Sequence, residues 1–304
     1  MRFILGVDGG GSKTVALLAD ETGRVIGRGT GGSCAFQALP EKDVRQSLRD
    51  AVNGAFAQAG IPVQPAAVLG LGISGVDRPG DHIKVQRFLN EEHLAQENIV
   101  VNDGELLLWC GALRGWGIGV ISGTGSIVIG RDPAGRFARA GGWGYRFGDE
   151  GSGFMIGTEA LRAVARADDQ RGPQTLLTRL VLEHWGLEKP CDLIPYVYQG
   201  NLPYAQVARL APLVGSAAAR GDAVAVEILE QAARDLIQTV AAVCRQLDFT
   251  GSVPTALGGG TLLHTQQLRA GLIRGAAEAG VRMEPLELAN EPAQGAVRMA
   301  LERL

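Results

Sequence analysis

The stretch LGVDGGGSKT, residues 5–14, decides the fold, because a run of three glycines here separates two apolar segments. Short apolar segments that end at glycine are typical of buried strands, and the glycines supply the turn between them. We therefore predict strands over residues 2–7 and 15–20, paired as a β-hairpin. Asp8 then stands at the tip of the first strand, beside the turn.

The glycine turn fits neither of two common nucleotide-binding motifs. A P-loop requires glycine directly before lysine and a helix afterwards, whereas Ser12 separates Gly11 from Lys13 and a strand follows. A dinucleotide fingerprint requires G-x-G-x-x-G before a helix, and that pattern is absent. The successive N–H groups of a glycine turn can instead converge on anionic oxygens. We predict that this turn binds phosphate and that Asp8 is a ligand of Mg²⁺, with turn capping as the alternative role of Asp8.

The same pattern recurs at residues 117–142, GIGVISGTGSIVIGRDPAGRFARAGG, as strand, glycine turn, strand, turn and strand. Two glycines and the serine of the first turn correspond here to Gly123, Gly125 and Ser126. This recurrence predicts two domains of one design, each opening with a β-hairpin. A chance match between two glycine-rich hairpins is the alternative. Two such turns can hold a polyphosphate from both sides.

Apolar periodicity predicts the remaining elements, which are mostly helical in the second half of the chain. A final helix is expected after Asn290, which would cap it. The predicted helices span residues 40–59, 81–96, 105–113, 153–169 and 222–247, and the further predicted strands span 24–30, 66–73, 98–102, 253–257 and 285–288.

A second aspartate, Asp103, follows the predicted strand 98–102 in the sequence VVNDGEL. Ligands of open α/β sheets bind beyond the carboxyl ends of the strands. A carboxylate placed there, near a transferable phosphoryl group, can accept the proton of an attacking hydroxyl. We therefore predict that Asp103 is a general base. Capping of the helix that begins near Glu105 is the alternative, and the two roles are compatible.

The composition excludes several functional classes. The chain has 304 residues, enough for two domains, and 46% of them are hydrophobic. A formal net charge of −3 gives no basic surface for nucleic acid or for an anionic membrane. No apolar run approaches the roughly 20 residues of a membrane span, and we expect the N-terminus to form a strand rather than a signal peptide. The four cysteines are far apart and form no CxxC motif, so we expect reduced thiols, no structural zinc and a cytoplasmic protein.

Five motifs, in the right order and over nearly the whole chain, resemble the actin-like ATPase superfold that sugar kinases, actin and heat-shock chaperones share. LGVDGGGSKT resembles its first phosphate motif, VISGTGSIVIG the second, VVNDGELLL and EPAQGAV the two connecting segments, and ALGGGTL the adenosine motif. The resemblance implies an α/β protein with two actin-like (ribonuclease H-like) domains and a nucleotide cleft between them. The first domain would comprise residues 1–104 and 291–304, and the second domain residues 105–290.

Residues 141–157, GGWGYRFGDEGSGFMIG, resemble the BadF/BadG-type ATPases, and above all their N-acetylglucosamine kinase branch. That resemblance implies transfer of a phosphoryl group from ATP, with Mg²⁺, to the 6-hydroxyl of an amino sugar. Asp103 would be the base and Asp8 the metal ligand. Around the sugar the resemblance places Ser74, Asn102, Asp103, Gly141, Gly142 and Asp149. Around ATP it places Gly10, Gly11, Ser12, Lys13, Thr14, Gly123, Thr124, Gly125, Gly258, Gly259 and Gly260. For Asp149 and Glu150, capping of the helix near Ser152 is the alternative.

Two departures from the family pattern bear on the substrate. In GGSCAFQALP, Ala35 occupies the position of an asparagine that contacts the sugar in the sugar-kinase members. Glucosamine and N-acetylmuramic acid therefore remain alternatives to N-acetylglucosamine. A partner-activating ATPase without a sugar substrate is a further alternative, although Cys110 and Cys191 do not match the cluster-binding cysteines of the dehydratase-activating relatives. A homodimer is implied by the resemblance alone.

Overall fold

The computed structural model describes residues 2–199 and 202–304. Contacts divide the chain into two compact units. The first unit comprises Met1–Trp116 and Glu291–Leu304, and the second comprises Gly117–Asn290. Residues 105–116, which the sequence assigns to the second domain, pack in the first unit. The expected domain ranges also include residues 1, 200 and 201, which lie outside the described part of the chain.

The first unit is built on a five-stranded sheet with the strand order β3-β2-β1-β4-β5. Antiparallel pairing joins β1 to β2 and β2 to β3, whereas β4 runs parallel to both β1 and β5. Gly9 pairs with Ile73 and Ile73 pairs with Asn102, so the carboxyl ends of three parallel strands meet at one edge. The strands are β1 (Ile4–Gly9), β2 (Thr14–Ala19), β3 (Val25–Gly31), β4 (Ala66–Ile73) and β5 (Ala95–Asn102).

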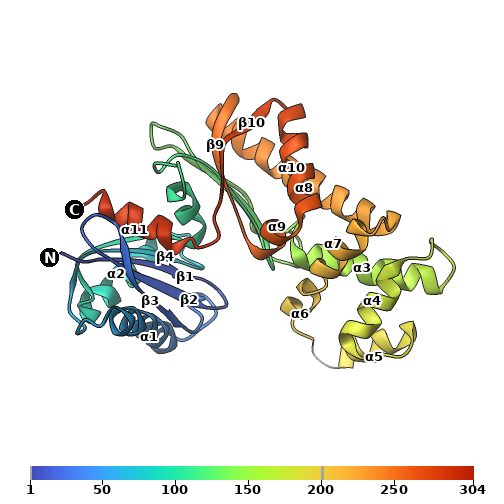
Figure 1. Ribbon diagram of the computed structural model, residues 1–304, viewed down its shortest axis with the longest axis horizontal. Helices are drawn as coiled ribbons and strands as arrows, with labels where there is room; N and C mark the ends of the chain where they lie inside the picture. The colour runs from blue at the N-terminus through green and yellow to red at the C-terminus, as the bar shows by residue number, and fades with distance from the viewer. Residues whose placement is uncertain (1, 200–201) are drawn as a thin grey trace. The chain divides into compact units, whose positions relative to one another are not determined.

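Helices cover both faces of this sheet. On one face, α1 (Glu41–Ala59) and α2 (Pro79–Glu92) pack with the strands around a buried core that includes Phe56 and Phe88. On the other face, α11 (Ala293–Leu301) packs against β1 and β4. Figure 1 shows this C-terminal helix in red beside the blue strands of the first unit. The short 3₁₀ helix η1 (Asp103–Trp109) follows β5, where the sequence predicts a helical segment over 105–113.

The last helix begins at Ala293, with Pro292 as the residue before its first turn. The side-chain amide of Asn290 donates instead to the backbone carbonyl of Leu288, at 3.3 Å. The expectation that Asn290 caps this helix is therefore wrong, because Asn290 lies too far before the first turn for its side chain to reach the free N–H groups there.

The second unit repeats the sheet of the first. Its strand order is β10-β9-β6-β7-β8, with antiparallel pairs joining β6 to β7 and β7 to β8 and with β9 parallel to β6 and β10. Strand by strand this is the topology of the first unit, so the recurring hairpin pattern reflects one repeated design. The strands are β6 (Gly117–Ser122), β7 (Ser126–Arg131), β8 (Phe137–Gly141), β9 (Gly251–Gly258) and β10 (Val281–Leu288).

The second unit is also rich in helices, and its longest one, α8, is strongly amphipathic. Asp222 caps α8 by accepting a hydrogen bond from the N–H of Ala225 at 2.9 Å, and its apolar face, including Leu236 and Val240, enters the core of the unit. The helices are α3 (Gly153–Asp168), α4 (Leu176–Trp185), η2 (Pro190–Asp192), α5 (Leu193–Gln199), α6 (Tyr204–Ala208), α7 (Ala211–Ala219), α8 (Ala223–Leu247), α9 (Gly260–His264) and α10 (Gln266–Glu278).

The two five-stranded sheets with their covering helices confirm the expected α/β fold class. Within the described residues, no helix is both long and apolar enough to cross a membrane.

Glycines at alternate positions of β3 allow α1 to lie unusually close to the sheet. A Cβ atom added at Gly27, Gly29 or Gly31 would lie 2.1, 2.0 or 1.9 Å from a backbone carbonyl oxygen of α1. The three carbonyls belong to residues spaced four apart along the helix, namely Ala55, Ala51 and Ser47. Every second residue of the strand therefore lies opposite every fourth residue of the helix along this contact.

Gly29→Ala should destabilise the protein by about 2–3 kcal/mol, because the added methyl group must displace backbone atoms rather than a flexible side chain. Urea denaturation measures the change in free energy of unfolding. Gly80→Ala is the matched control: its added Cβ meets no atom within 4 Å at the start of α2, so it should be neutral or stabilise by up to ~1 kcal/mol. Equal unfolding midpoints for the two variants would contradict the close approach.

Candidate active site

The predicted site residues fall into two groups, one in each unit. In the first unit, the ends of three parallel strands bring together Asp8, Ser74 and Asp103. The backbone N–H of Ser74 donates to the carbonyl of Gly9 at 2.9 Å, which ties the end of β4 to the end of β1. The Ser74 hydroxyl in turn donates a hydrogen bond to the Asp103 carboxylate. The edge that the sequence predicts is thus present, with two partly buried carboxylates on it.

The first glycine turn is compact and faces solvent. The N–H of Gly10 donates to the carbonyl of Lys13 at 3.1 Å, which closes the turn, and Gly11, Ser12 and Lys13 are exposed at its tip. Thr14 differs from the other four residues predicted to hold ATP here. Its side chain is fully buried, and its hydroxyl donates to the carbonyl of Gly32 at 2.7 Å. The structure therefore leaves the turn itself, and not the Thr14 side chain, accessible to a ligand.

Asp8 is an acid held in an unfavourable environment. Its pKa is raised to about 7, chiefly by burial and also by the negative charges of Asp103 and Glu291, while the positive charge of Lys13 opposes this rise. Because an isolated carboxylate loses free energy when it is taken out of water beside other carboxylates, the site favours the arrival of a proton or a cation at Asp8.

Asp103 has the properties of a base. Its pKa is raised to about 6, chiefly by burial and also by the nearby charge of Asp77, whereas hydrogen bonds from the Gly104 N–H and the Ser74 hydroxyl oppose this rise. A carboxylate with this pKa is ionised at neutral pH and accepts a proton more readily than an ordinary aspartate.

Asn102, rather than Asp103, caps the short helix that follows β5. Its side-chain oxygen accepts a hydrogen bond from the Gly104 N–H at 2.9 Å, and its own N–H donates to the Glu105 carboxylate at 3.2 Å. The alternative role of Asp103 as that cap is therefore wrong. The side-chain amide of Asn102 also donates to Asp77 at 3.0 Å, so both ends of the carboxamide already have partners in the protein. A sugar contact of Asn102 stays a prediction.

Ala35 lies beside this group of residues. The N–H of Cys34 donates to the carbonyl of Gly10, and the N–H of Phe36 donates to the carbonyl of Ser74, both at 3.0 Å. These two bonds draw the loop after β3 across the ends of β1 and β4, with Ala35 between them. The position that departs from the family pattern is thus next to the candidate site.

In the second unit, two glycine loops meet at the corresponding sheet edge. Ile121 of β6 pairs with Gly258 of β9, which places the turn 123–125 beside the loop 258–260. Gly259 has a φ of 85°, and a Cβ there would lie 2.4 Å from the carbonyl carbon and oxygen of Ser122. Only glycine fits such a position, so these loops are built for close backbone packing. The Thr261 hydroxyl donates to the carbonyl of Gly123 at 2.9 Å and fixes the pair.

Asp149 anchors the loop that carries the family signature. It is 7% exposed, and its carboxylate accepts hydrogen bonds from the N–H groups of Gly144, at 3.2 Å, and Ser126. Burial raises its pKa. The cap of α3 is Ser152, which accepts from the N–H of Met155, so capping by Asp149 or Glu150 is wrong. Gly141 and Gly142 lie at the start of this loop with positive φ. Their sugar contacts, and that of Asp149, stay predictions.

Two acidic residues near the predicted carboxylates are absent from the sequence predictions, Asp77 near Asp103 and Glu291 near Asp8. Asp77 follows Ser74 in the loop after β4, and Glu291 begins the segment that returns to the first unit, where it pairs with Arg28 at 2.7 Å. The sequence does contain a local indication of both residues, because each lies within or beside a motif that follows the end of a strand. Their contacts depend on the register of distant strands, which no local pattern contains.

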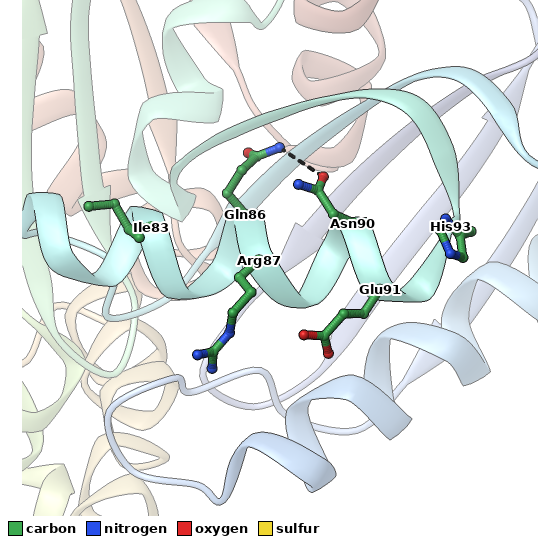
Figure 2. Close-up of a pocket in the computed structure, with 6 residues that line it drawn as sticks. All are labelled: Ile83, Gln86, Arg87, Asn90, Glu91 and His93. Atoms are coloured by element: carbon green, nitrogen blue, oxygen red, sulfur yellow. Dashed lines mark hydrogen bonds between the residues drawn. The ribbon is translucent and has the colours of Figure 1, made fainter.

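A surface hollow of about 620 Å³ lies on the outer side of α2, away from these residues. Figure 2 shows that its lining comes from that helix and the residue after it, with the Gln86 amide donating to Asn90. It contains no predicted site residue. The lining residues are Ile83, Gln86, Arg87, Asn90, Glu91 and His93.

The fold and the site together define an α/β protein of two repeated sheets, with glycine turns on both and a pair of carboxylates on the first. The chain belongs to the BadF/BadG/BcrA/BcrD ATPase family, whose model matches residues 5–300.

Its relatives include sugar kinases. A protein of Clostridium acetobutylicum described as an N-acetylmuramic acid/N-acetylglucosamine kinase is 35% identical over 261 residues, which cover 85% of each chain. An N-acetyl-D-glucosamine kinase of Dictyostelium discoideum is 29% identical over 312 residues, covering 99% of this chain and 98% of that one. A solved structure from Chromobacterium violaceum, described as a candidate N-acetylglucosamine kinase, is 34% identical, covers 99% of both chains and has a TM-score of 0.78.

Asp103→Asn should stabilise the folded protein at pH 8, in the absence of nucleotide and divalent cations, by up to about 3 kcal/mol. The folded-state pKa of about 6 lies above the ordinary aspartate pKa of 3.8, so the ionised carboxylate destabilises the folded state at high pH. This penalty fades as the pH falls from 6 towards 3.8, where both states bind the proton. Denaturant unfolding at pH 8 and pH 4 measures it. If the free energies of unfolding of wild type and variant differ by the same amount at both pH values, the raised pKa of Asp103 is contradicted.

Proposed function

We propose that this chain is an ATP-dependent kinase of amino sugars that converts N-acetylglucosamine to its 6-phosphate. The observation that carries the proposal is the position of Asp103, partly buried at the end of β5, hydrogen-bonded by Ser74 and close to a second carboxylate, Asp8. Membership in an ATPase family supports the use of ATP. The named activities of the relatives support an amino sugar as the phosphoryl acceptor.

Asp103 is the general base of the proposed reaction. It accepts the proton of the sugar 6-hydroxyl as the oxygen attacks the γ-phosphorus, and the bond to the leaving ADP oxygen breaks. Phosphoryl transfer requires mainly positioning and charge stabilisation from the protein. The hydrogen bonds from Ser74 and Gly104 hold the carboxylate in place before the sugar binds.

The glycine turns are the proposed phosphate-binding elements. Residues 11–13 are exposed on the first unit, and on the other unit the partly buried turn 123–125 lies beside the loop 258–260, of which Gly260 is exposed. Lys13 adds a positive charge beside Asp8. Backbone amides in such turns stabilise anionic oxygens without the entropy cost of ordering long side chains.

The residues present also fit a divalent cation. Asp8 offers one carboxylate whose ionisation is opposed by burial and by neighbouring acids, and a cation would relieve that repulsion. Within the described residues, no group of three or more His, Cys, Asp or Glu side chains is arranged as a metal cluster. Mg²⁺ needs none, because it binds nucleotides through phosphate oxygens, waters and one or two carboxylates. When bound, Mg²⁺ neutralises the charge of the phosphates during transfer.

A cytoplasmic location and a homodimer belong to the same proposal. The four cysteines are free thiols and three of them are buried, which supports a reducing compartment. The dimer rests on the family resemblance, and analytical ultracentrifugation of the purified protein tests it.

Asp103→Asn should lower kcat by about 10²–10⁴-fold, because general base catalysis is lost. ATP should bind with nearly the wild-type Kd, since Asp103 contacts the sugar and not the nucleotide. Coupled ADP release measures turnover, and isothermal titration measures ATP affinity. Asp20→Asn, at an exposed turn that bonds Thr22, is the control and should keep full activity. A variant at position 103 that keeps wild-type kcat would exclude Asp103 as the base.

Ala35→Asn should change sugar selectivity, because the loop places this residue beside Ser74. A new hydrogen bond of about 1 kcal/mol should raise kcat/KM roughly fivefold for those sugars that present a polar group there. The test compares N-acetylglucosamine, glucosamine, N-acetylmuramic acid, N-acetylmannosamine and glucose, each with Mg-ATP. A uniform change across all five sugars would show that position 35 does not face the substrate. If wild type turns over none of them, a partner-activating ATPase becomes the better assignment.

A further inference from the structure

The loop between β4 and α2 carries an aspartate that contacts the turn of the candidate base. One carboxylate oxygen of Asp77 accepts a hydrogen bond from the side-chain amide of Asn102, at 3.0 Å. Asp77 is solvent-exposed, whereas Asn102 is partly buried. The contact therefore joins a surface loop to the point where β5 ends and η1 begins, one residue before Asp103.

Asn102 in turn holds the backbone on both sides of Asp103. Its side-chain oxygen accepts from the Gly104 N–H at 2.9 Å, and the same N–H lies 3.0 Å from a carboxylate oxygen of Asp103. The N–H of Asn102 donates to Glu105 at 3.2 Å. Asp103 therefore lies inside a turn whose shape depends on the orientation of the Asn102 carboxamide.

Asp77 selects the orientation of the Asn102 carboxamide. A carboxamide has a donor end and an acceptor end, and its terminal torsion is broad and roughly twofold, so rotation exchanges the two ends at little cost. The Gly104 N–H can only donate and the ionised Asp77 carboxylate can only accept. Together they allow one orientation, with the oxygen toward Gly104 and the amide nitrogen toward Asp77. Without Asp77, only the Gly104 N–H favours this orientation, and the acceptor for the amide nitrogen is lost.

We propose that Asp77 is a positioning residue for phosphoryl transfer, which orients Asn102 and thereby holds the Asp103 turn in its productive shape. This inference rests on the proposed function. It assigns Asp77 no contact with sugar or nucleotide, so loss of Asp77 should reduce kcat and leave the KM for ATP nearly unchanged. Outer partners that orient metal ligands commonly contribute 10–100-fold to activity, and we take the same scale for a partner that orients the turn of a catalytic base. The exposure of Asp77 places the expected loss at the lower end, about tenfold.

The test is a double-mutant cycle with Asp77→Ala, Asn102→Ala and the combined variant, assayed with N-acetylglucosamine and Mg-ATP. If Asp77 acts through Asn102, removing it from the Asn102→Ala protein should change kcat by less than about twofold beyond the effect of its charge on the Asp103 pKa, and Asp77→Asn removes that charge while keeping the acceptor. Asp77→Asn keeps an acceptor for the Asn102 amide and should restore kcat to within about threefold of wild type. Asp20→Ala, which removes another loop-anchoring aspartate of the same unit, is the control and should keep wild-type kcat.

Three results would overturn the inference: an unchanged kcat in Asp77→Ala, a raised sugar KM with unchanged kcat, or the same loss of kcat in both backgrounds. Thermal unfolding of each variant identifies a protein that fails to fold. If Asp77→Ala does not fold, the test rests on Asp77→Asn alone. A tenfold loss of kcat in Asp77→Asn would then count against the role assigned to the hydrogen bond. If the wild-type protein shows no turnover, the proposed function itself is refuted. If the wild-type protein is active and Asp77→Ala is equally active, only the role of Asp77 is refuted.

Discussion

The register of three parallel strands is the constraint on which the candidate site depends. Because Gly9, Ile73 and Asn102 lie side by side at the ends of β1, β4 and β5, two aspartates are brought to one sheet edge in a partly buried setting. A slip of one residue in either pairing would turn Asp8 or Asp103 to the other face. The long apolar strands, buried on both sides by α1, α2 and α11, hold that register.

The same arrangement has an energetic cost that suits catalysis. Burial and the charge of Asp103 raise the pKa of Asp8 to about 7, and burial and the charge of Asp77 raise the pKa of Asp103 to about 6. The free protein therefore carries an electrostatic penalty that a cation and a substrate proton would each relieve. Stability and activity are opposed at such positions, and the surrounding core supplies the excess stability.

Much of this organisation could be predicted from the sequence. The glycine turns, the strands around them and the placement of Asp8 and Asp103 at strand ends follow from apolar runs that stop at glycine or aspartate, because those patterns are local. Local patterns failed to choose between neighbouring candidate caps. The cap of η1 is Asn102 rather than Asp103, and the cap of α3 is Ser152 rather than Asp149, whose carboxylate accepts from the N–H of Gly144 instead. The Asp77–Asn102 contact links two loops that are remote in sequence, so no single segment could reveal it.

The most direct measurement is identification of the product by phosphorus-31 NMR after incubation of the wild-type protein with Mg-ATP and N-acetylglucosamine. We expect ADP together with an equal amount of a phosphate monoester on the sugar 6-oxygen, formed only when sugar is present. Release of inorganic phosphate without any sugar phosphate, at a rate that the sugar does not change, would contradict it.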